Sequence, residues 1–264
     1  MSQPSYETIL FEVHFDRVAT VTLNRPEAMN SFNRKMVEEF ADLWKRVQET
    51  PEIHAVVLQA ADGRAFSTGV DVKEPLAFDT DNVWSQADPG SKLAPKASGC
   101  WKPVVAAVHG LCAAGAFYWL NEADIIISSE DAQFFDPHVT YGQVAVIEMV
   151  GLSYRLPLGE VLRMALLGND ERISASTALR LGFLSEVVSR GELHGRAREL
   201  AAIIAAKHSI ATQGTVRAIW EALDQPRSIA LSRALQYCQL GNPVSMSQVD
   251  RPSLMSKAKT FKVR

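Results

Sequence analysis

The chain has 264 residues, of which 47% are hydrophobic and 22% are charged, and its formal net charge is −3. This composition suits a protein with a large buried core, and the small negative charge gives no electrostatic reason to expect binding to nucleic acid or to an anionic membrane. No stretch approaches the roughly 18 apolar residues of a membrane-spanning helix, and residues 1–16 lack the basic and apolar regions of a signal peptide. The three cysteines are widely spaced, without a CxxC pair, which indicates reduced thiols and predicts a cytoplasmic protein.

The amino-terminal segments predict a strand–strand–helix unit. Thr8–His14 and Val18–Leu23 are β-type runs on either side of Asp16-Arg17, which is typical of an antiparallel hairpin. Asn33 can cap a helix that runs to about Gln48, since apolar residues recur there at steps of three and four. Ala55–Ala60 is then expected to be the next buried strand.

Two turns of small residues follow buried strands. One is Gly63–Lys73, after Ala55–Ala60, and the other is Ala113–Ala116, after the β-branched strand Val104–Val108. Small residues let a backbone approach a ligand closely, and the first N–H groups of a helix have no partner within it. Either turn alone is compatible with an ordinary strand exit. Together they predict two backbone N–H groups aimed at one oxygen, which is an oxyanion hole.

The middle and the end of the chain are less specific. Leu76–Gly99 reads as a long loop, with Phe78 and Trp84 as candidate walls of a pocket or as core residues. After Glu192 the pattern predicts helices alone. The expected helices are Leu193–Lys207, Ala211–Leu223, Arg227–Leu240 and Val244–Lys259.

Five segments together resemble the enoyl-CoA hydratase/isomerase (crotonase) superfamily: Arg25-Pro26 with Asn30, AFSTGVD, KPVVAAVHG, EADIIISSEDAQF and RISASTALRLGFLSEVV. The resemblance extends from about Ile9 to Val188. It implies an α/β fold in which strand–strand–helix units form a spiral core over residues 1–190. Residues 191–264 would then be a helical region that covers the site and builds a homotrimer or a hexamer.

The resemblance also implies roles for individual residues. The backbone N–H groups of Val70 and Gly115 would bind a thioester carbonyl and hold the enolate formed at the α-carbon. Arg25, Ala28 and Lys73 match positions that bind coenzyme A. The acyl-CoA thioester would be the substrate, and neither a metal ion nor a redox cofactor is expected, because no ligand spacing or dinucleotide fingerprint is present.

The chain departs from the hydratase pattern at both catalytic glutamates. The first aligns with Tyr118 and the second with His138. With an ordinary pKa of about 10, Tyr118 is a poor base, whereas His138 titrates near working pH and can serve as acid or base. A carboxylate at Glu148 would orient the imidazole as in a triad. Alternatively, His138 bonds locally and Glu148 caps a helix, while Asp136 is expected to serve a turn.

Three hypotheses for the function stay open. The first is an acyl-CoA enzyme in which His138, with Glu148, moves protons in isomerisation, hydration or dehydration. The second is a hydrolase of carbon–carbon bonds, similar to the β-diketone hydrolase branch, which also places a histidine after the proline. The third is a protein that binds acyl-CoA without catalysis, which the loss of both glutamates would fit.

Overall fold

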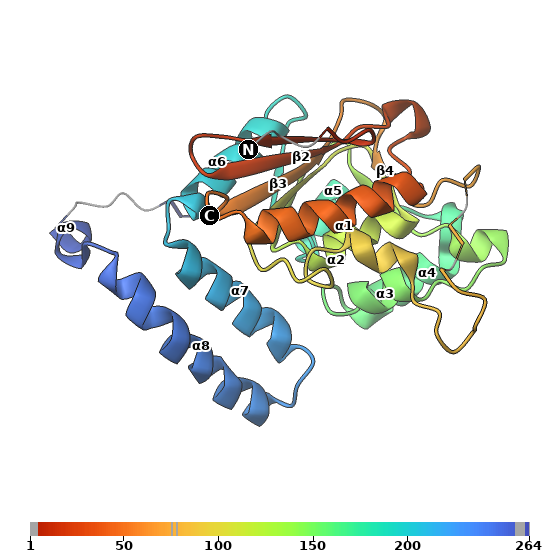
Figure 1. The fold of residues 1–264 in the computed structure, drawn as a ribbon. Coiled ribbons are helices and arrows are strands. Elements are labelled where there is room, and N and C mark those ends of the chain that lie inside the picture. The colour runs from red at the N-terminus through yellow and green to blue at the C-terminus, as the bar shows by residue number, and fades with distance from the viewer. Residues whose placement is uncertain (1–4, 75, 78, 257–261, 264) are drawn as a thin grey trace. The chain divides into compact units, whose positions relative to one another are not determined.

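A computed structural model describes residues 5–74, 76–77, 79–256 and 262–263 of the chain (Figure 1). Contacts divide the chain into two compact units, Met1–Ala206 and Lys207–Arg264. Among the described residues, all strands belong to the first unit, whereas the second contains only helices and their connections. The expected functional division at residues 190 and 191 stays a prediction.

The larger sheet has six strands in the order β1-β2-β3-β5-β7-β10. β1 and β2 pair antiparallel, which confirms the predicted hairpin, and all the other pairs are parallel. The bounds are β1 Ile9–Val13, β2 Val18–Leu23, β3 Ala55–Ala60, β5 Val104–Val108, β7 Ile125–Ser129 and β10 Glu186–Val188. Strands buried on both faces read as continuous apolar runs, as β5 does and as β3 does apart from the partly buried Gln59.

The smaller sheet has four strands in the order β4-β6-β8-β9: Ala65–Ser67, Leu111–Ala113, Gln133–Phe135 and Ile173–Ser174. Its first three strands are parallel neighbours. Each comes directly after a strand of the larger sheet, β4 after β3, β6 after β5 and β8 after β7. The chain therefore repeats one step three times, from the larger sheet to the smaller one, and the residues that leave β4, β6 and β8 emerge at the same edge.

Nine helices are described, and they have the following bounds: α1 Arg34–Glu49, α2 Phe117–Glu122, α3 Ile147–Leu152, α4 Leu158–Leu167, α5 Ala175–Arg180, α6 Leu193–Ala205, α7 Ser209–Ala222, α8 Arg227–Ser247 and α9 Arg251–Ser256. The predicted cap of α1 is confirmed, because the Asn33 side chain accepts a hydrogen bond from the Met36 N–H group. The predicted start of a new helix at Val244 is wrong, since α8 continues through Pro243 to Ser247. Lys257 and Lys259 lie outside the described residues.

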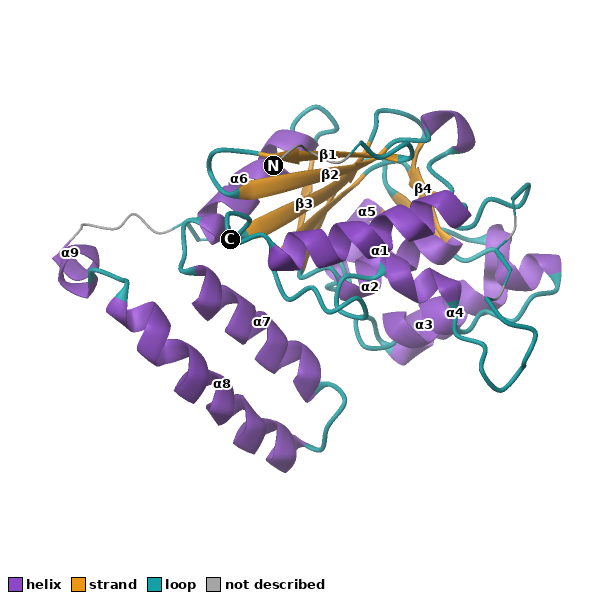
Figure 2. Cartoon of the chain, in the orientation of Figure 1, coloured by secondary structure: helices purple, strands orange, loops and turns teal. Residues whose placement is uncertain are grey.

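The larger sheet is covered on both faces (Figure 2). On one face, alternate strand residues such as Val57 and Val105 pack with Leu193, Ala197 and Ala201 of α6. The opposite strand residues belong to the main core, which also contains the apolar face of α1 and most of α2. The period of two in the strands and of 3.6 in the helices thus divides the apolar residues between two buried layers.

An aromatic cluster fixes α2 against α1. Trp119 of α2 is fully buried and contacts Phe40, Phe32 and Phe66, with ring centroids 5.2, 5.8 and 6.3 Å away. Aromatic pairs in these edge-on and tilted arrangements contribute about 0.5–1.5 kcal/mol each beyond the area that they bury. The position of α2, and of the turn before it, therefore depends on this cluster.

We expect Phe40→Ala to lower the free energy of unfolding by about 3–5 kcal/mol, because it leaves a cavity between α1 and α2. Urea denaturation followed by circular dichroism measures the change. Phe15→Ala is the matched control, since the Phe15 side chain is fully exposed, and it should change stability by less than about 0.5 kcal/mol. Equal losses in the two variants would contradict the assignment of this cluster to the core.

Candidate active site

Three chain segments meet at one edge of the smaller sheet. Thr68–Val70 leaves β4, Ala114–Ala116 leaves β6, and Asp136–His138 leaves β8. Because these three strands are parallel neighbours, their carboxyl ends lie in a row. In parallel sheets this edge is where backbone donors and side chains most often converge on a ligand. It brings together both turns that the sequence singled out and the predicted acid/base residue.

The two turns are in direct contact. A Cβ atom placed on Gly69 would lie 2.7 Å from the Ala114 Cβ and 2.8 Å from the Gly115 nitrogen, so no other residue fits at this position. Gly69 also has φ of 87°, in the left-handed region that favours glycine. The backbone of the first turn therefore lies against the backbone of the second.

Phe32 holds both turns. Its N–H group donates to the Gly69 carbonyl at 2.9 Å, and its carbonyl accepts from the Asp71 N–H group at 2.8 Å. In this parallel bridge, the N–H group of Val70 points away from Phe32. The Phe32 ring lies over Gly115, since a Cβ atom there would come within 2.5 Å of it.

The second turn presents free backbone donors of its own. Ala114–Ala116 is a single 3-10 turn that leads into α2, and its first N–H groups have no partner within the turn. Ala114 has φ of 50°, which is costly for a residue with a side chain. Strained backbone of this kind is concentrated at functional sites, and here it sets the direction of the Gly115 peptide.

His138 is held by Asp136 rather than by Glu148. The Asp136 Oδ1 atom accepts hydrogen bonds from the His138 backbone N–H group at 2.8 Å and from the ring Nδ1 at 2.7 Å. Asp136 is fully buried. The expectation that Asp136 serves only a turn is therefore wrong, because one carboxylate oxygen both closes the turn and orients the imidazole. Its signal in the sequence is the spacing Asp-Pro-His, which lets a short side chain reach back two residues.

Glu148 approaches the other side of the ring. Its Oε1 atom lies 4.0 Å from His138 Nε2, so the imidazole stands between two carboxylates. Glu148 is positioned by α2, because Asn121 donates a hydrogen bond to the Glu148 backbone carbonyl at 2.8 Å. Gly151 makes room for this, since a Cβ atom there would lie 2.5 Å from the Asn121 amide nitrogen.

The two groups have raised pKa values for different reasons. The hydrogen bond to Asp136 raises the pKa of His138 most, with smaller effects from the charges of Asp136 and Glu148, while burial opposes the shift. Burial raises the pKa of Glu148, partly offset by the positive charge of His138. Both shifts favour the protonated forms, so this pair retains protons to higher pH than the free side chains do.

Tyr118 borders the same space from the first turn of α2. Its ring packs edge-on against Phe32, with centroids 6.2 Å apart, and beside the Gly115 position. Burial raises the pKa of Tyr118, and the carboxylates of Glu148 and Asp88 raise it further. The phenol is therefore neutral over the working range of pH.

The residues matched to coenzyme A binding come from two segments: Arg25 and Ala28 follow β2, and Lys73 follows Val70 of the first turn. The Arg25 guanidinium is mostly buried and pairs with Asp71 at 2.9 Å, and it also donates to the Ser31 carbonyl at 2.7 Å. Ala28 ends a 3-10 turn, Pro26–Ala28, and is partly exposed, while the Lys73 side chain is exposed. Arg25 thus fixes the loop that carries Ala28, and Lys73 keeps its charge at the surface.

The long loop contributes a residue that the sequence did not single out. Asp88 is near enough to Tyr118 and Glu148 to raise the pKa of each. The prediction that Trp84 forms a pocket wall or packs in the core is wrong, since this residue is 94% exposed. Phe78, the other candidate, lies outside the described residues. Nothing in the local pattern of a polar loop distinguishes Asp88 from its neighbours, because only the folded chain brings it to α2.

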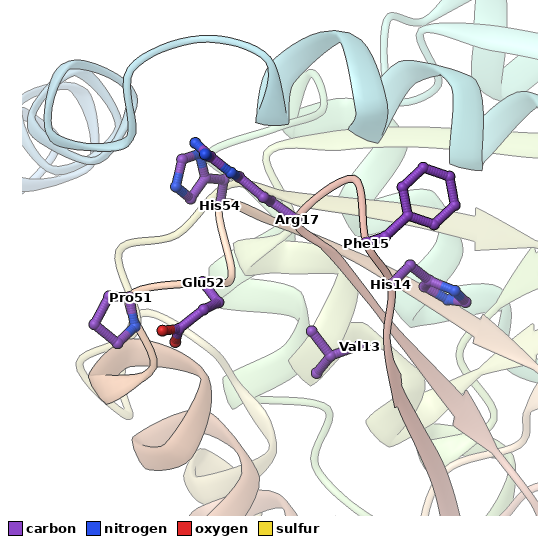
Figure 3. A pocket seen from close by; sticks show the side chains of 7 residues that line it. All are labelled: Val13, His14, Phe15, Arg17, Pro51, Glu52 and His54. Atoms are coloured by element: carbon purple, nitrogen blue, oxygen red, sulfur yellow. The ribbon is translucent and has the colours of Figure 1, made fainter. Parts of the chain in front are cut away.

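A separate open cleft of about 560 Å³ lies at the other end of the strands (Figure 3). It is formed by the β1–β2 turn and the loop between α1 and β3. It is lined by Val13, His14, Phe15, Arg17, Pro51, Glu52 and His54. None of the predicted site residues lines it, so its chemistry is separate from that of the edge described above.

Comparison with known proteins agrees with this arrangement. The family model described as enoyl-CoA hydratase/isomerase matches residues 15–250. (E)-benzylidenesuccinyl-CoA hydratase of Thauera aromatica is 32% identical over 212 residues, which cover 80% of this chain and 82% of that protein. A (7aS)-7a-methyl-1,5-dioxo-2,3,5,6,7,7a-hexahydro-1H-indene-carboxyl-CoA hydrolase of Rhodococcus jostii is 34% identical over 193 residues, or 73% of this chain and 72% of that protein.

Solved structures give the same result. The crystal structure of an enoyl-CoA hydratase/isomerase from Mycobacterium paratuberculosis matches with a TM-score of 0.80 and 36% identity, covering 89% of this chain and 90% of that one. The expected crotonase-like α/β fold is thereby confirmed, with two mixed sheets and carboxyl-terminal helices. Within the described residues, no helix is long and apolar enough to cross a bilayer. The chain belongs to the enoyl-CoA hydratase/isomerase family and is an enzyme of the crotonase type.

Proposed function

We propose that the protein converts an acyl-CoA thioester through an enolate that is bound by the backbone N–H groups of Val70 and Gly115. The observation that carries this proposal is the contact of the two glycine turns beside the Asp136–His138–Glu148 array. Backbone donors aimed at a developing negative charge stabilise a transition state strongly, since the loss of one typically costs on the order of 3–4 kcal/mol. A thioester carbonyl that accepts from both donors would have its α-carbon within reach of His138.

His138 is the proposed acid/base residue. With Asp136 holding Nδ1, Nε2 is the nitrogen that exchanges protons with the substrate, and the carboxylate stabilises the imidazolium that results. Glu148 lies on the same Nε2 side and can carry a second proton, because its pKa is raised. Tyr118 contributes a neutral hydroxyl as a hydrogen-bonding group. Proton transfer at the α- or γ-carbon then gives isomerisation, or the hydration or dehydration of an unusual enoyl thioester.

The proposal assigns Tyr118 and His138 to the two positions where hydratases of this family carry glutamates. Since a neutral phenol cannot activate water as a carboxylate does, the usual paired-carboxylate hydration is not expected. Arg25, Ala28 and Lys73 are assigned to the coenzyme A side of the site. Lys73 would meet a phosphate group, whereas Arg25 would act by ordering the loop, because its charge is already paired with Asp71.

Hydrolysis of a carbon–carbon bond is the second candidate. Two observations support it: the imidazole flanked by carboxylates and the similarity to a relative named as a carboxyl-CoA hydrolase. Because that name also includes coenzyme A, binding of coenzyme A does not separate the two candidates. Mass spectrometry of the products does, since hydrolysis adds water and opens the carbon skeleton. Binding of acyl-CoA without turnover of any thioester would instead support the third hypothesis, a non-catalytic acyl-CoA-binding protein.

We propose further that the chain forms a trimer or a hexamer. In α7 and α8 large apolar side chains are exposed in the single chain: Ile219 at 63%, Leu231 and Leu235 at 58%, and Leu240 at 75%. Exposed apolar residues gathered on neighbouring helices are typical of surfaces that pack against another subunit.

His138→Gln should lower kcat on enoyl-CoA thioesters by roughly 100- to 10,000-fold, the usual contribution of a general acid or base. The affinity for the thioester should change little, because the backbone donors and the coenzyme A side are intact. Turnover is followed by the absorbance of the conjugated thioester, and affinity by calorimetry. His14→Gln, in the β1–β2 turn region, is the matched control, and full turnover by His138→Gln would remove His138 from the mechanism.

Asp136→Asn should lower the pKa of His138, and Glu148→Gln should lower it less, following the order of the causes of the shift. Histidine Cε1–H resonances titrated by NMR give the values, with the resonance of residue 138 identified by its loss in His138→Gln. Because the folded-state pKa lies above the unfolded value of about 6.5, this interaction stabilises the fold fully below pH 6.5. The stabilisation is lost as pH rises through the folded-state pKa. An unchanged titration in Asp136→Asn would contradict the assigned hydrogen bond.

Light scattering coupled to size exclusion should give three or six times the 29.0 kDa mass of one chain. Leu235→Glu should dissociate the assembly, because it places a charge within an apolar contact. A monomeric wild-type chain would rule out this assembly.

A further inference from the structure

Asp88 begins the 3-10 turn Pro89–Leu93 within the long loop, and only one of its carboxylate oxygens is used there. Oδ1 accepts a hydrogen bond from the Gly90 N–H group at 3.0 Å, as a cap of the turn. Oδ2 is buried and has no hydrogen-bond partner within the described part of the chain. An unpaired buried carboxylate oxygen is costly, so a polar hydrogen close to it would stabilise the loop.

The turn that Asp88 caps lies against the hydroxyl end of Tyr118. A Cβ atom on Gly90 would come within 2.5 Å of the Tyr118 Cζ and 2.9 Å of its hydroxyl oxygen, so the glycine lets the loop close over the phenol. At its other end the Tyr118 ring passes the Gly115 position, where a Cβ atom would lie 3.4 Å from Cδ2. One side chain thus extends from the second glycine turn to the Asp88 turn.

The charges around Tyr118 agree with this geometry. The carboxylate of Asp88 helps to raise the pKa of Tyr118, and it also contributes to the raised pKa of Glu148. Glu148 lies 4.0 Å from His138, and the charges of Asp136 and Asp88 raise its pKa. Asp88 is therefore electrostatically part of the site, although it comes from a different segment.

We propose that Asp88 is a positioning residue whose Oδ2 accepts a hydrogen bond from the Tyr118 hydroxyl, which leaves the phenol oxygen oriented as a hydrogen-bond acceptor toward Glu148. A tyrosine hydroxyl has one proton, so when it donates to Asp88 its oxygen is left to accept from a neighbour. A protonated Glu148, or water beside it, is a suitable donor. In this arrangement Asp88 acts through Tyr118 to keep Glu148 in its proton-carrying form. The inference rests on the function proposed above, in which Glu148 supplies the second proton.

A purely structural role for Asp88 makes a different prediction. If the carboxylate only caps Pro89–Leu93, Asp88→Asn should be harmless, because the amide oxygen can still accept from the Gly90 N–H group. If Asp88 positions Tyr118, the same change reverses the hydrogen bond, since an amide NH₂ would donate to the phenol oxygen. Asp88→Asn keeps the cap but also removes the charge that helps to raise the pKa of Glu148, so the substitution has to be combined with Tyr118→Phe to separate the two roles.

The test is a double-mutant cycle with Asp88→Asn, Tyr118→Phe and the double variant, measured as kcat and as the pH profile of kcat. Asp88→Asn should lower kcat roughly tenfold and move the limb that Glu148 contributes to lower pH. The double variant should be no slower than Tyr118→Phe alone, because Asp88 acts through the hydroxyl. Asp79→Asn, in an exposed ion pair of the same loop with Arg34 and Lys92, should have no effect. Independent, additive losses, or full activity of Asp88→Asn, would overturn the proposal.

A second measurement does not require turnover. With 3-fluorotyrosine in place of the five tyrosines, the ¹⁹F resonance of residue 118 is identified by its loss in Tyr118→Phe. The chemical shift of this resonance should change in Asp88→Asn and stay the same in Asp79→Asn. An unchanged shift in both variants would overturn the proposed contact between Asp88 and Tyr118. If the wild-type enzyme converts no acyl-CoA thioester, the proposed function fails, but the ¹⁹F comparison still decides whether Asp88 holds Tyr118.

Discussion

The site depends on the close approach of two backbones at Gly69. Because this residue has no side chain and takes a left-handed conformation, the turn after β4 lies against Ala114 and Gly115 of the turn after β6. Any side chain at this position would separate the turns and, with them, the two peptide N–H groups that the proposed mechanism aims at one oxygen. Both the proposed enolate chemistry and the roles proposed for the surrounding side chains depend on this contact.

The sheets explain why the proposed catalytic groups, which come from distant parts of the chain, meet there. Three successive steps from the larger to the smaller sheet place β4, β6 and β8 side by side and parallel. The first two strands lead into the turns with the proposed backbone donors, and the third leads to Asp136 and His138. α2 and α3 then add Tyr118 and Glu148 from the neighbouring side, joined by the Asn121 hydrogen bond. A short polar segment after each strand is enough, because the scaffold supplies the geometry.

Local pattern and family resemblance predicted the hairpin, α1, the two glycine turns and the place of His138, since each has a signal within a few residues. The hydrogen-bond partner of the imidazole was missed. The sequence does not show whether the Asp136 carboxylate only closes a turn or also accepts a hydrogen bond from the His138 ring. Asp88 was missed for a different reason, as its neighbour Tyr118 lies 30 residues away along the chain and only the closed loop brings them together. The continuation of α8 through Pro243 shows that a proline does not always end a helix once neighbouring turns support it.

Phe32 has a part in this arrangement that its burial alone does not suggest. Its backbone clamps the first turn on both sides of Val70, and its ring rests on Gly115 in the second. The distance between the two proposed peptide donors therefore depends on one uncharged aromatic residue that takes no part in the proposed proton transfers. In enzymes of this fold, a different side chain at the position of Phe32 could change the width of the proposed oxyanion hole. The acid/base residues would not have to change.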